Sequence, residues 1–251
     1  MIKIFVITLK DAIDRQRHIR ALFNDVQIPF EFVYGIDGRK LSLEEISDIY
    51  DIEKSKRLEK ELGPGEIGCT LSHRHIYSIL LEKNIERALI FEDDVKIMPD
   101  LFSLMPLLDS IPINGYMIKF DKFNGKQTDN DNVKRGHFTP WHRIHLDKNY
   151  FIGQPLHDPS LGWCYYIDIK AAFIMWKIMA KIFFTADKWS YFRKFIKLRM
   201  INKALVFDND SVFISMIGNR ASAKTMKNKN LFGFIIRKME KFAILFLLFF
   251  H

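Results

Sequence analysis

The chain has 251 residues, of which 48% are hydrophobic and 27% are charged, which suits one large α/β domain or a domain with an appendage. The charged fraction places the protein in the soluble class. The two cysteines, Cys69 and Cys164, have no metal-ligand spacing. We therefore expect two reduced thiols in a reducing compartment.

The net charge of +8 is unevenly distributed along the chain. Residues 170–251 contain 16 Lys and Arg against 4 Asp and Glu, a balance of +12. Residues 1–169 carry 22 against 26, a balance of −4. This asymmetry indicates a basic face or tail that meets an anionic partner, such as phospholipid, nucleic acid or a phosphorylated glycolipid.

The N-terminal part has the pattern of a βαβ unit. Residues 2–9 (IKIFVITL) predict a buried strand, because charged residues follow and no cleavage site of a signal peptide is present. Residues 11–26 have apolar side chains at helical spacing, and residues 29–37 predict a second strand that ends in a turn. This order predicts a parallel sheet with a right-handed crossover.

The alternation of helices and strands continues after this unit. A polar helical excursion is expected first, then a helix that leads into a strand covered on both faces, because its apolar run is continuous. Two more strands and a strand followed by an apolar helix complete the expected elements. In chain order, these segments are residues 41–65, 66–85, 87–95, 115–123, 161–183 and 204–210.

The end of the chain combines basic and apolar residues. Residues 242–250 are nine consecutive apolar residues, too few to span a bilayer as a helix. Arg237, Lys238 and Lys241 precede them, and each basic residue near an anionic leaflet contributes on the order of 1 kcal/mol. We expect a membrane-associating tail at residues 218–251 after a domain at residues 1–217; packing of the tail on its own domain or a partner is the alternative.

Three consecutive acids, Glu92, Asp93 and Asp94, close the apolar run of residues 87–95. Acids at the end of a buried parallel strand suit a divalent cation bound to a diphosphate, because Mg²⁺ and Mn²⁺ prefer oxygen ligands. In extended chain, Glu92 and Asp94 would share one face and Asp93 would oppose them. The alternative is a surface turn of solvated acids.

A glycine-rich segment, residues 63–77 (GPGEIGCTLSHRHIY), opens the helix before that strand. Backbone N–H groups at such a helix start can bind phosphate. A structural hydrogen bond of His73 is the alternative to a functional role for this side chain.

Together, four segments have the order and spacing of glycosyltransferase family 25, which the chain resembles over residues 2–217. The segments are residues 6–19, 34–41, 65–95 and 161–172. The family includes bacterial lipooligosaccharide galactosyltransferases. The resemblance implies a GT-A-type fold with a mostly parallel central sheet, flanking helices and a basic C-terminal extension. It also implies inverting transfer of a hexose from a UDP-sugar with the help of Mn²⁺ or Mg²⁺.

The resemblance places the metal and nucleotide acids of the family at residues 92–94. It implies Asp94 as the main metal ligand, with Glu92 as a second ligand, and Glu92 or Asp93 as a contact to the ribose. One departure is that Trp163 and Cys164 stand where smaller residues are common in the family. The residues expected to bind the nucleotide are Thr8, Leu9, Arg15, Gly65, Glu66, Ser72, His73, Glu92 and Asp93.

Inverting transfer requires a carboxylate that takes the proton of the acceptor hydroxyl. Asp187, in a segment that resembles a short family motif (TADKW), is the expected base, and Asp158 is the alternative. Helix capping explains Asp187 equally well. Asp208, Asp210 and Ser215 lie where the family has a polar, partly acidic motif, and a turn capped by Asp210 or Ser211 is the alternative. The acids in residues 129–131 are interpreted as solvated loop surface.

These expectations describe a cytoplasmic enzyme, peripheral on the inner face of the bacterial inner membrane. Its partners would be a UDP-hexose, with galactose favoured over glucose, a lipooligosaccharide or lipopolysaccharide acceptor, and an anionic membrane surface; nucleic acid is not expected. A metal-dependent phosphoesterase also suits acids beside a basic face, but no second acidic cluster for a two-metal site is found. A non-catalytic basic protein that binds the membrane surface would leave the acidic strand end unexplained.

Overall fold

The computed structural model describes residues 1–58, 60–122 and 138–209. The strands are β1 (Lys3–Thr8), β2 (Glu31–Tyr34), β3 (Arg87–Glu92), β4 (Val95–Ile97), β5 (Tyr116–Lys119), β6 (Ile144–His145), β7 (Phe151–Gly153), β8 (Cys164–Asp168), β9 (Lys197–Ile201) and β10 (Val206–Asp208). The helices are α1 (Ile13–Val26), η1 (Gly38–Lys40), α2 (Leu43–Ile49), α3 (Ile52–Leu58), α4 (Pro64–Glu82), α5 (Asp100–Ser103), α6 (Met105–Asp109), α7 (Ile169–Ile178) and α8 (Trp189–Phe192). The expected tail at residues 218–251, Asp210, Ser211, Ser215 and the loop acids at 129–131 lie outside the described residues.

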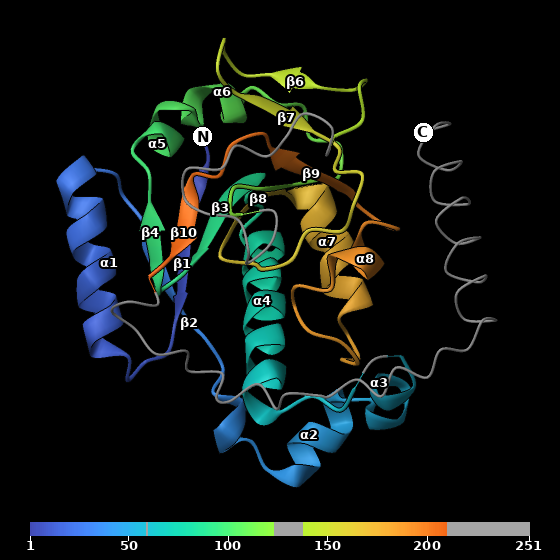
Figure 1. The fold of residues 1–251 in the computed structure, drawn as a ribbon. Coiled ribbons are helices and arrows are strands. Elements are labelled where there is room, and N and C mark those ends of the chain that lie inside the picture. Colours follow the sequence, from blue (N-terminus) through green and yellow to red (C-terminus); the bar gives the residue numbers. More distant parts are fainter. Residues whose placement is uncertain (59, 123–137, 210–251) are drawn as a thin grey trace. The chain divides into compact units, whose positions relative to one another are not determined.

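Eight strands form one sheet in the order β2-β1-β3-β8-β5-β9-β7-β6 (Figure 1). β1 pairs in parallel with β2 and β3, and β5 pairs in parallel with β9. β8 runs antiparallel between β3 and β5, and β7 runs antiparallel between β9 and β6. Six strands therefore point one way and only β7 and β8 the other, which confirms the α/β fold with a mostly parallel central sheet.

The sheet is covered on both faces because its strands alternate apolar residues between two cores. In β1, Val6 packs in one core with Ile19 of α1, whereas Phe5 packs in the other with Ile76 of α4. Burial of each such side chain contributes roughly 1.5–3 kcal/mol relative to exposure. The two cores fix α1, α5 and α6 on one face of the sheet and α4 and α7 on the other.

Helix α4 carries the predicted glycine-rich segment and leads directly into β3. Pro64 suits the first helical position, because its missing N–H would have no partner within the helix. Glu66 Oε2 accepts a hydrogen bond from the Gly63 N–H at 2.9 Å. A Cβ on Gly68 would lie 2.5 Å from the Ile36 carbonyl oxygen, so the loop after β2 packs directly on the helix backbone.

The predicted strand near the end of the described chain is β10, but it does not join the central sheet. It pairs antiparallel with β4 in a separate two-stranded sheet. The Asn209 N–H donates to the Asp94 carbonyl at 2.9 Å. The ribbon of β4 and β10 therefore holds the turn that contains the acids.

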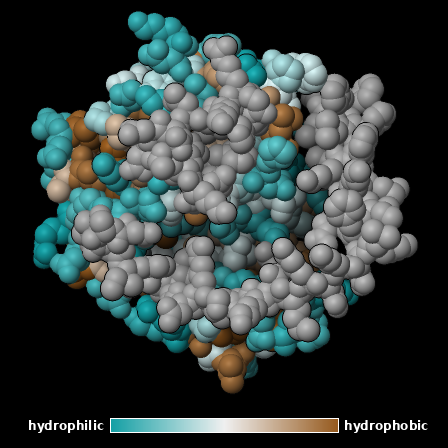
Figure 2. Space-filling view, in the orientation of Figure 1, coloured by the Kyte–Doolittle hydropathy of each residue, from teal (hydrophilic) through white to brown (hydrophobic). Residues whose placement is uncertain are grey.

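The described residues can be compared with the expectation of a protein that associates with a membrane. Within these residues, we find no helix with the length and apolar character required to cross a bilayer. In the view of Figure 2, the described surface is mainly hydrophilic, and its apolar residues form separate areas.

Candidate active site

The three acids lie at the carboxyl end of β3, where the sequence predicts them. β1 ends beside them at Thr8, and the reversed strand β8 begins at the same edge of the sheet with Cys164. The Glu92 N–H donates to the Trp163 carbonyl at 2.9 Å, which continues the pairing of β3 and β8. This edge is where open α/β sheets bind ligands.

Arg15 of α1 bridges two of the acids. Its Nη1 lies 2.7 Å from Asp93 Oδ1 and 3.0 Å from Asp94 Oδ2. Thr8 Oγ1 donates to the other oxygen of Asp93 at 2.6 Å. Arg15 and Asp93 are 8% and 6% exposed, so these bonds are nearly shielded from water. The guanidinium is the counter-charge that permits two adjacent carboxylates at a covered strand end.

Asp94 has one oxygen bonded and one without a partner. Its Oδ2 accepts from Arg15, whereas its Oδ1 is buried and has no hydrogen-bond partner. Burial, and after it the charge of Glu92, raise the pKa of Asp94 to about 7 against the opposing effect of Arg15. A buried carboxylate oxygen without a donor, beside a second acid, fits the ligand set of a Mn²⁺ or Mg²⁺ ion.

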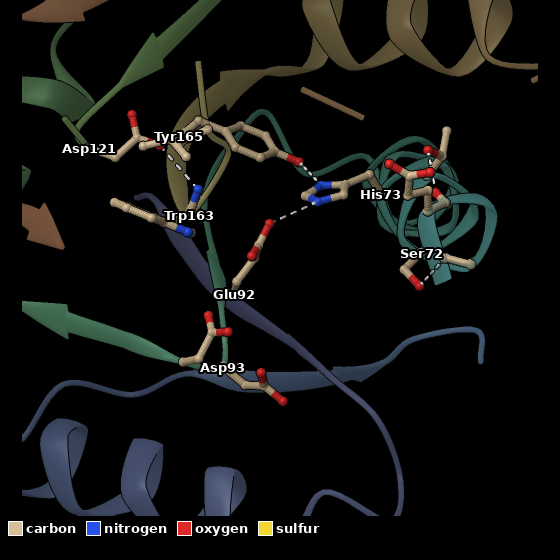
Figure 3. A network of polar contacts seen from close by, with 12 residues as sticks. Ser72, His73, Glu92, Asp93, Asp121, Trp163 and Tyr165 are labelled. Atoms are coloured by element: carbon tan, nitrogen blue, oxygen red, sulfur yellow. Dashed lines mark hydrogen bonds and ion pairs between the residues drawn. The ribbon is translucent and has the colours of Figure 1, made fainter. Parts of the chain in front are cut away.

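The alternation expected for the acids does not hold beyond Glu92. Residues 93 and 94 form a turn between β3 and β4, so the two-residue period of extended chain ends there. As a result, Asp93 and Asp94 both face Arg15. Glu92 extends towards His73, away from Asp93 (Figure 3).

His73 belongs to a buried row of polar side chains. Its Nδ1 lies 2.7 Å from Tyr165 Oη, which in turn lies 3.0 Å from Tyr77 Oη. Its Nε2 lies 3.8 Å from Glu92 Oε1 (Figure 3). Burial raises the pKa of Tyr165 well above its ordinary value, so this hydroxyl keeps its proton. The row fixes the His73 ring and directs Nε2 at Glu92.

A buried ion pair lies at the end of β5. Lys119 and Asp121 are both fully buried. Lys119 Nζ lies 2.7 Å from Asp121 Oδ1, but the two atoms are not aligned as a hydrogen bond, so their contact is an ion pair. The ammonium donates to the carbonyl oxygens of Ser160 and Leu161 at 2.7 and 2.6 Å. Asp121 Oδ2 accepts from the Trp163 N–H at 3.1 Å. This pair therefore holds the loop of residues 160–163 beside the acids.

The two candidate bases have different surroundings. A Cβ built on Gly162 would lie 3.7 Å from both Glu92 Oε1 and Asp187 Cβ, so Asp187 and Glu92 flank this glycine. Asp158 is paired with Arg193 at 2.9 Å and half exposed. The structure thus places Asp187 beside the same glycine as Glu92, whereas Asp158 is engaged in an ion pair.

Ser72 has two backbone partners. Its Oγ donates to the Gly68 carbonyl at 2.7 Å and accepts from the Ile36 N–H at 2.8 Å. These bonds attach the loop after β2 to α4. Nucleotide binding by Ser72 stays a prediction.

Three more of the residues expected to bind the nucleotide, Leu9, Gly65 and Glu66, lie at the starts of helices α1 and α4 or next to them. The Leu9 carbonyl accepts from Gln16 Nε2 at 2.9 Å, which fixes the start of α1. Glu66 Oε1 pairs with Lys60 Nζ at 2.7 Å, and Gly65 lies in the first turn of α4. Their contacts organise this edge of the sheet, and their role in nucleotide binding stays a prediction.

Sequence reasoning missed Lys119, Asp121 and Tyr165. The alternation of residues 119 and 121 around Phe120 is a signal for two polar side chains on one face of a strand end. Tyr165 lies in an apolar run, where an aromatic residue reads as core. No sequence signal connects it to His73, because the two are 92 positions apart.

The chain also matches known proteins. The sequence profile described as Glycosyltransferase family 25 (LPS biosynthesis protein) matches residues 1–190. The chain belongs to glycosyltransferase family 25. The matched residues include the acidic turn, the row of His73 and Tyr165, and Asp187.

Three relatives of this family 25 chain illustrate its range. A Haemophilus influenzae protein provisionally designated a glycosyltransferase is 33% identical over 122 residues, which are 49% of this chain and 42% of that protein. A Drosophila melanogaster glycosyltransferase 25 family member is 32% identical over 39% of this chain and 16% of its own. Human procollagen galactosyltransferase 2 is 32% identical over 43% of this chain and 18% of its own. The matched part therefore spans less than half the length of each relative.

Proposed function

We propose that this family 25 chain is an inverting hexosyltransferase that moves galactose, or alternatively glucose, from a UDP-sugar to a lipooligosaccharide or lipopolysaccharide acceptor. Family membership supports glycosyl transfer from a nucleotide-sugar donor to a glycan acceptor. A relative named procollagen galactosyltransferase supports galactose as the donor sugar. The observation that carries the proposal is the buried, unbonded Asp94 Oδ1 at the carboxyl ends of the strands.

Asp94 and Glu92 are the residues that would hold a Mn²⁺ or Mg²⁺ ion. Such an ion offsets the negative charge that grows on the leaving diphosphate. Arg15 and Thr8 bind Asp93 and thereby keep the turn, and with it Asp94, in one position. A site held by buried residues needs little reorganisation when a substrate binds.

The transfer exchanges one bond at the anomeric carbon for another. The acceptor oxygen forms a bond to this carbon while the bond to the diphosphate oxygen breaks, and UDP leaves with the electron pair. In our proposal, the acceptor proton moves to the carboxylate of Asp187, which lies beside Gly162, as Glu92 does. Attack on the face opposite the leaving group inverts the configuration, and the carbon carries partial positive charge during the exchange.

The direct test is turnover with UDP-galactose, Mn²⁺ and a glucose-terminated glycolipid acceptor. We expect UDP and a β-linked product, and loss of both in Asp94→Ala. Asp14→Ala, which removes an exposed acid from α1, is the control and should keep full activity. Full turnover by Asp94→Ala would contradict the proposed role of Asp94, and hydrolysis of the donor without transfer would favour a phosphoesterase.

The identity of the base has its own test. Asp187→Asn should lower kcat by at least about 100-fold, as is usual for loss of a general base, with a smaller change in KM. Asp158→Asn should lower kcat much less, because Asp158 is engaged with Arg193. The reverse ranking of the two variants would assign the base to Asp158.

We further propose that the enzyme acts in the cytoplasm, peripherally on the inner face of the bacterial inner membrane. The balance of +12 in residues 170–251 and the apolar run at 242–250 support this placement. Co-sedimentation with vesicles that contain anionic lipid should be lost when Arg237, Lys238 and Lys241 are replaced by Gln. Unchanged sedimentation of this triple variant would contradict the proposal.

A further inference from the structure

Cys69, His73 and Glu92 bring three different ligand atoms together beside the acidic turn. The Cys69 sulfur, one His73 ring nitrogen and one Glu92 carboxylate oxygen all lie within 4.8 Å of one another. Among residues 1–58, 60–122 and 138–209, no other group of three such ligands is as close. We propose that these residues form a second metal site, for Zn²⁺, which shares only Glu92 with the Mn²⁺ or Mg²⁺ site at Asp94.

The scaffold of this site is rigid. Cys69 and His73 are four positions apart on α4, so their side chains lie on the same face of the helix. Glu92 reaches them from the end of β3, which is paired on both sides in the central sheet. Two regular elements thus supply the three ligands, and only side-chain rotation is needed to bring them onto one ion.

The separation of His73 and Glu92 suits two ligands of one metal ion. Their Nε2 and Oε1 atoms lie 3.8 Å apart, which is too long for a hydrogen bond. Zn–N and Zn–O bonds of roughly 2.0–2.2 Å at a tetrahedral angle place such atoms about 3.4 Å apart. The distances to be closed are therefore a few tenths of an ångström for this pair and at most about 1.3 Å for the thiolate, whose sulfur lies within 4.8 Å of the other two atoms.

The second contact of the His73 ring also suits metal binding. An imidazole that binds a metal through one nitrogen usually donates the N–H of the other to a fixed acceptor. Here Nδ1 lies 2.7 Å from Tyr165 Oη, and the Tyr165 hydroxyl can donate in turn to Tyr77 at 3.0 Å. Buried tyrosines therefore hold the ring with Nε2 directed at Glu92.

The ligand chemistry selects the ion. A thiolate and an imidazole favour Zn²⁺ over Mg²⁺ or Mn²⁺, which prefer oxygen. Three protein ligands leave a fourth position open for water or a substrate atom. Because Glu92 would serve both metal sites, Zn²⁺ binding should withdraw Glu92 from Asp94 and lower the rate of sugar transfer. This expected loss of activity rests on the proposed function, whereas Zn²⁺ binding itself does not.

The test uses the metal alone, without nucleotide, on the full chain free of affinity tags. Zn²⁺ affinity is measured by competition with a chromophoric chelator, and Co²⁺ serves as a spectroscopic probe. We expect one Zn²⁺ per chain, and an absorption band from a Co²⁺–thiolate bond in the wild type. Cys69→Ala should lose this band and weaken Zn²⁺ binding at least about tenfold. Cys164→Ala, which removes the buried thiol of β8, should keep both.

A second measurement on the wild type covers the case in which Cys69→Ala fails to fold. Zn²⁺ should protect Cys69 from alkylation by iodoacetamide at least about tenfold, as quantified by mass spectrometry, and Mg²⁺ should not. Equal alkylation with and without Zn²⁺, or unchanged Zn²⁺ affinity in a folded Cys69→Ala, would overturn the proposal. Neither outcome bears on UDP-sugar turnover, so the two proposals fail separately.

Discussion

Asp94 and Asp93 show how burial and charge are balanced at single residues. Both carboxylates are bonded to one guanidinium, yet Asp94 keeps an oxygen without a donor. The sequence predicts that a cation binds at the three adjacent acids. In the structure, the guanidinium of Arg15 is one such positive charge, because it pairs with Asp93 and Asp94. Arg15 itself could be placed at the site only through the resemblance, because nothing in its own helix distinguishes it from Arg17.

Replacement of Arg15 tests this balance. Arg15→Met leaves Asp93 and Asp94 near each other without their counter-charge, and should lower the free energy of unfolding by about 3–5 kcal/mol. Arg17→Met is the matched control, because its pair with Asp14 on the same helix is largely exposed and contributes at most about 0.5 kcal/mol. Urea unfolding measures both, and equal stabilities of the two variants would contradict a structural role for Arg15.

Asp121 gives a pH dependence with a defined sign. Burial raises its pKa from 3.8 to about 6, against the opposing effect of Lys119. Between about pH 4 and 6, the folded chain therefore binds more protons at this site than the unfolded chain. Its contribution to stability falls as the pH rises through this window, by about 3 kcal/mol, and is constant above it.

Asp121→Asn isolates this contribution. The free energy of unfolding of the wild type minus that of the variant should fall between pH 4 and 6 and then level off. Other titrating groups cancel in the difference. Urea unfolding at four pH values from 4 to 7 measures it. A difference that rises with pH would mean that the ion pair with Lys119 outweighs burial.

At the scale of elements, the helix α4 and the strand β3 follow directly from the sequence. Apolar residues at helical spacing and the continuous run before Glu92 predict both elements and place the acids at the strand end. The sequence does not predict β6, β7 or β9, because β6 and β7 have two or three residues and β9 alternates Arg and Lys with apolar residues. The reversed direction of β8 depends on its pairing with β3 and β5, which no local pattern records.

The glycine-rich segment has a packing role that one variant tests. In Gly68→Ala, the new Cβ would lie 2.5 Å from the Ile36 carbonyl oxygen, and the loop after β2 must move. We expect a loss of about 1–3 kcal/mol, although alanine alone favours a helix by about 1 kcal/mol.

Gly63→Ala is the control for this variant, because its Cβ would meet only Glu66 Oε2 at 3.8 Å. Thermal unfolding of both variants measures the difference. A Gly68→Ala protein as stable as the wild type would contradict the close packing of α4 on the loop.

At the scale of the whole molecule, the fold brings the ends of β1, β3 and β5 and the start of β8 to one edge. Composition and periodicity predict the α/β class. The four segments that resemble family 25 predict the family, and the match of the family profile to residues 1–190 confirms it. The partners of the acids come from residues far apart in the chain, such as Thr8, Arg15 and Asn209, so only the folded topology assembles them. Asp187 and Gly162 meet Glu92 for the same reason.

The central claim is that the unbonded oxygen of Asp94 holds a divalent ion that binds a nucleotide diphosphate. Calorimetric titration with UDP-galactose, with and without Mn²⁺, tests it in the wild type and in Asp94→Asn, which keeps the shape of the side chain. We predict that Mn²⁺ strengthens binding to the wild type at least about tenfold and has no effect on the folded variant. The same gain from Mn²⁺ in both proteins would contradict the account.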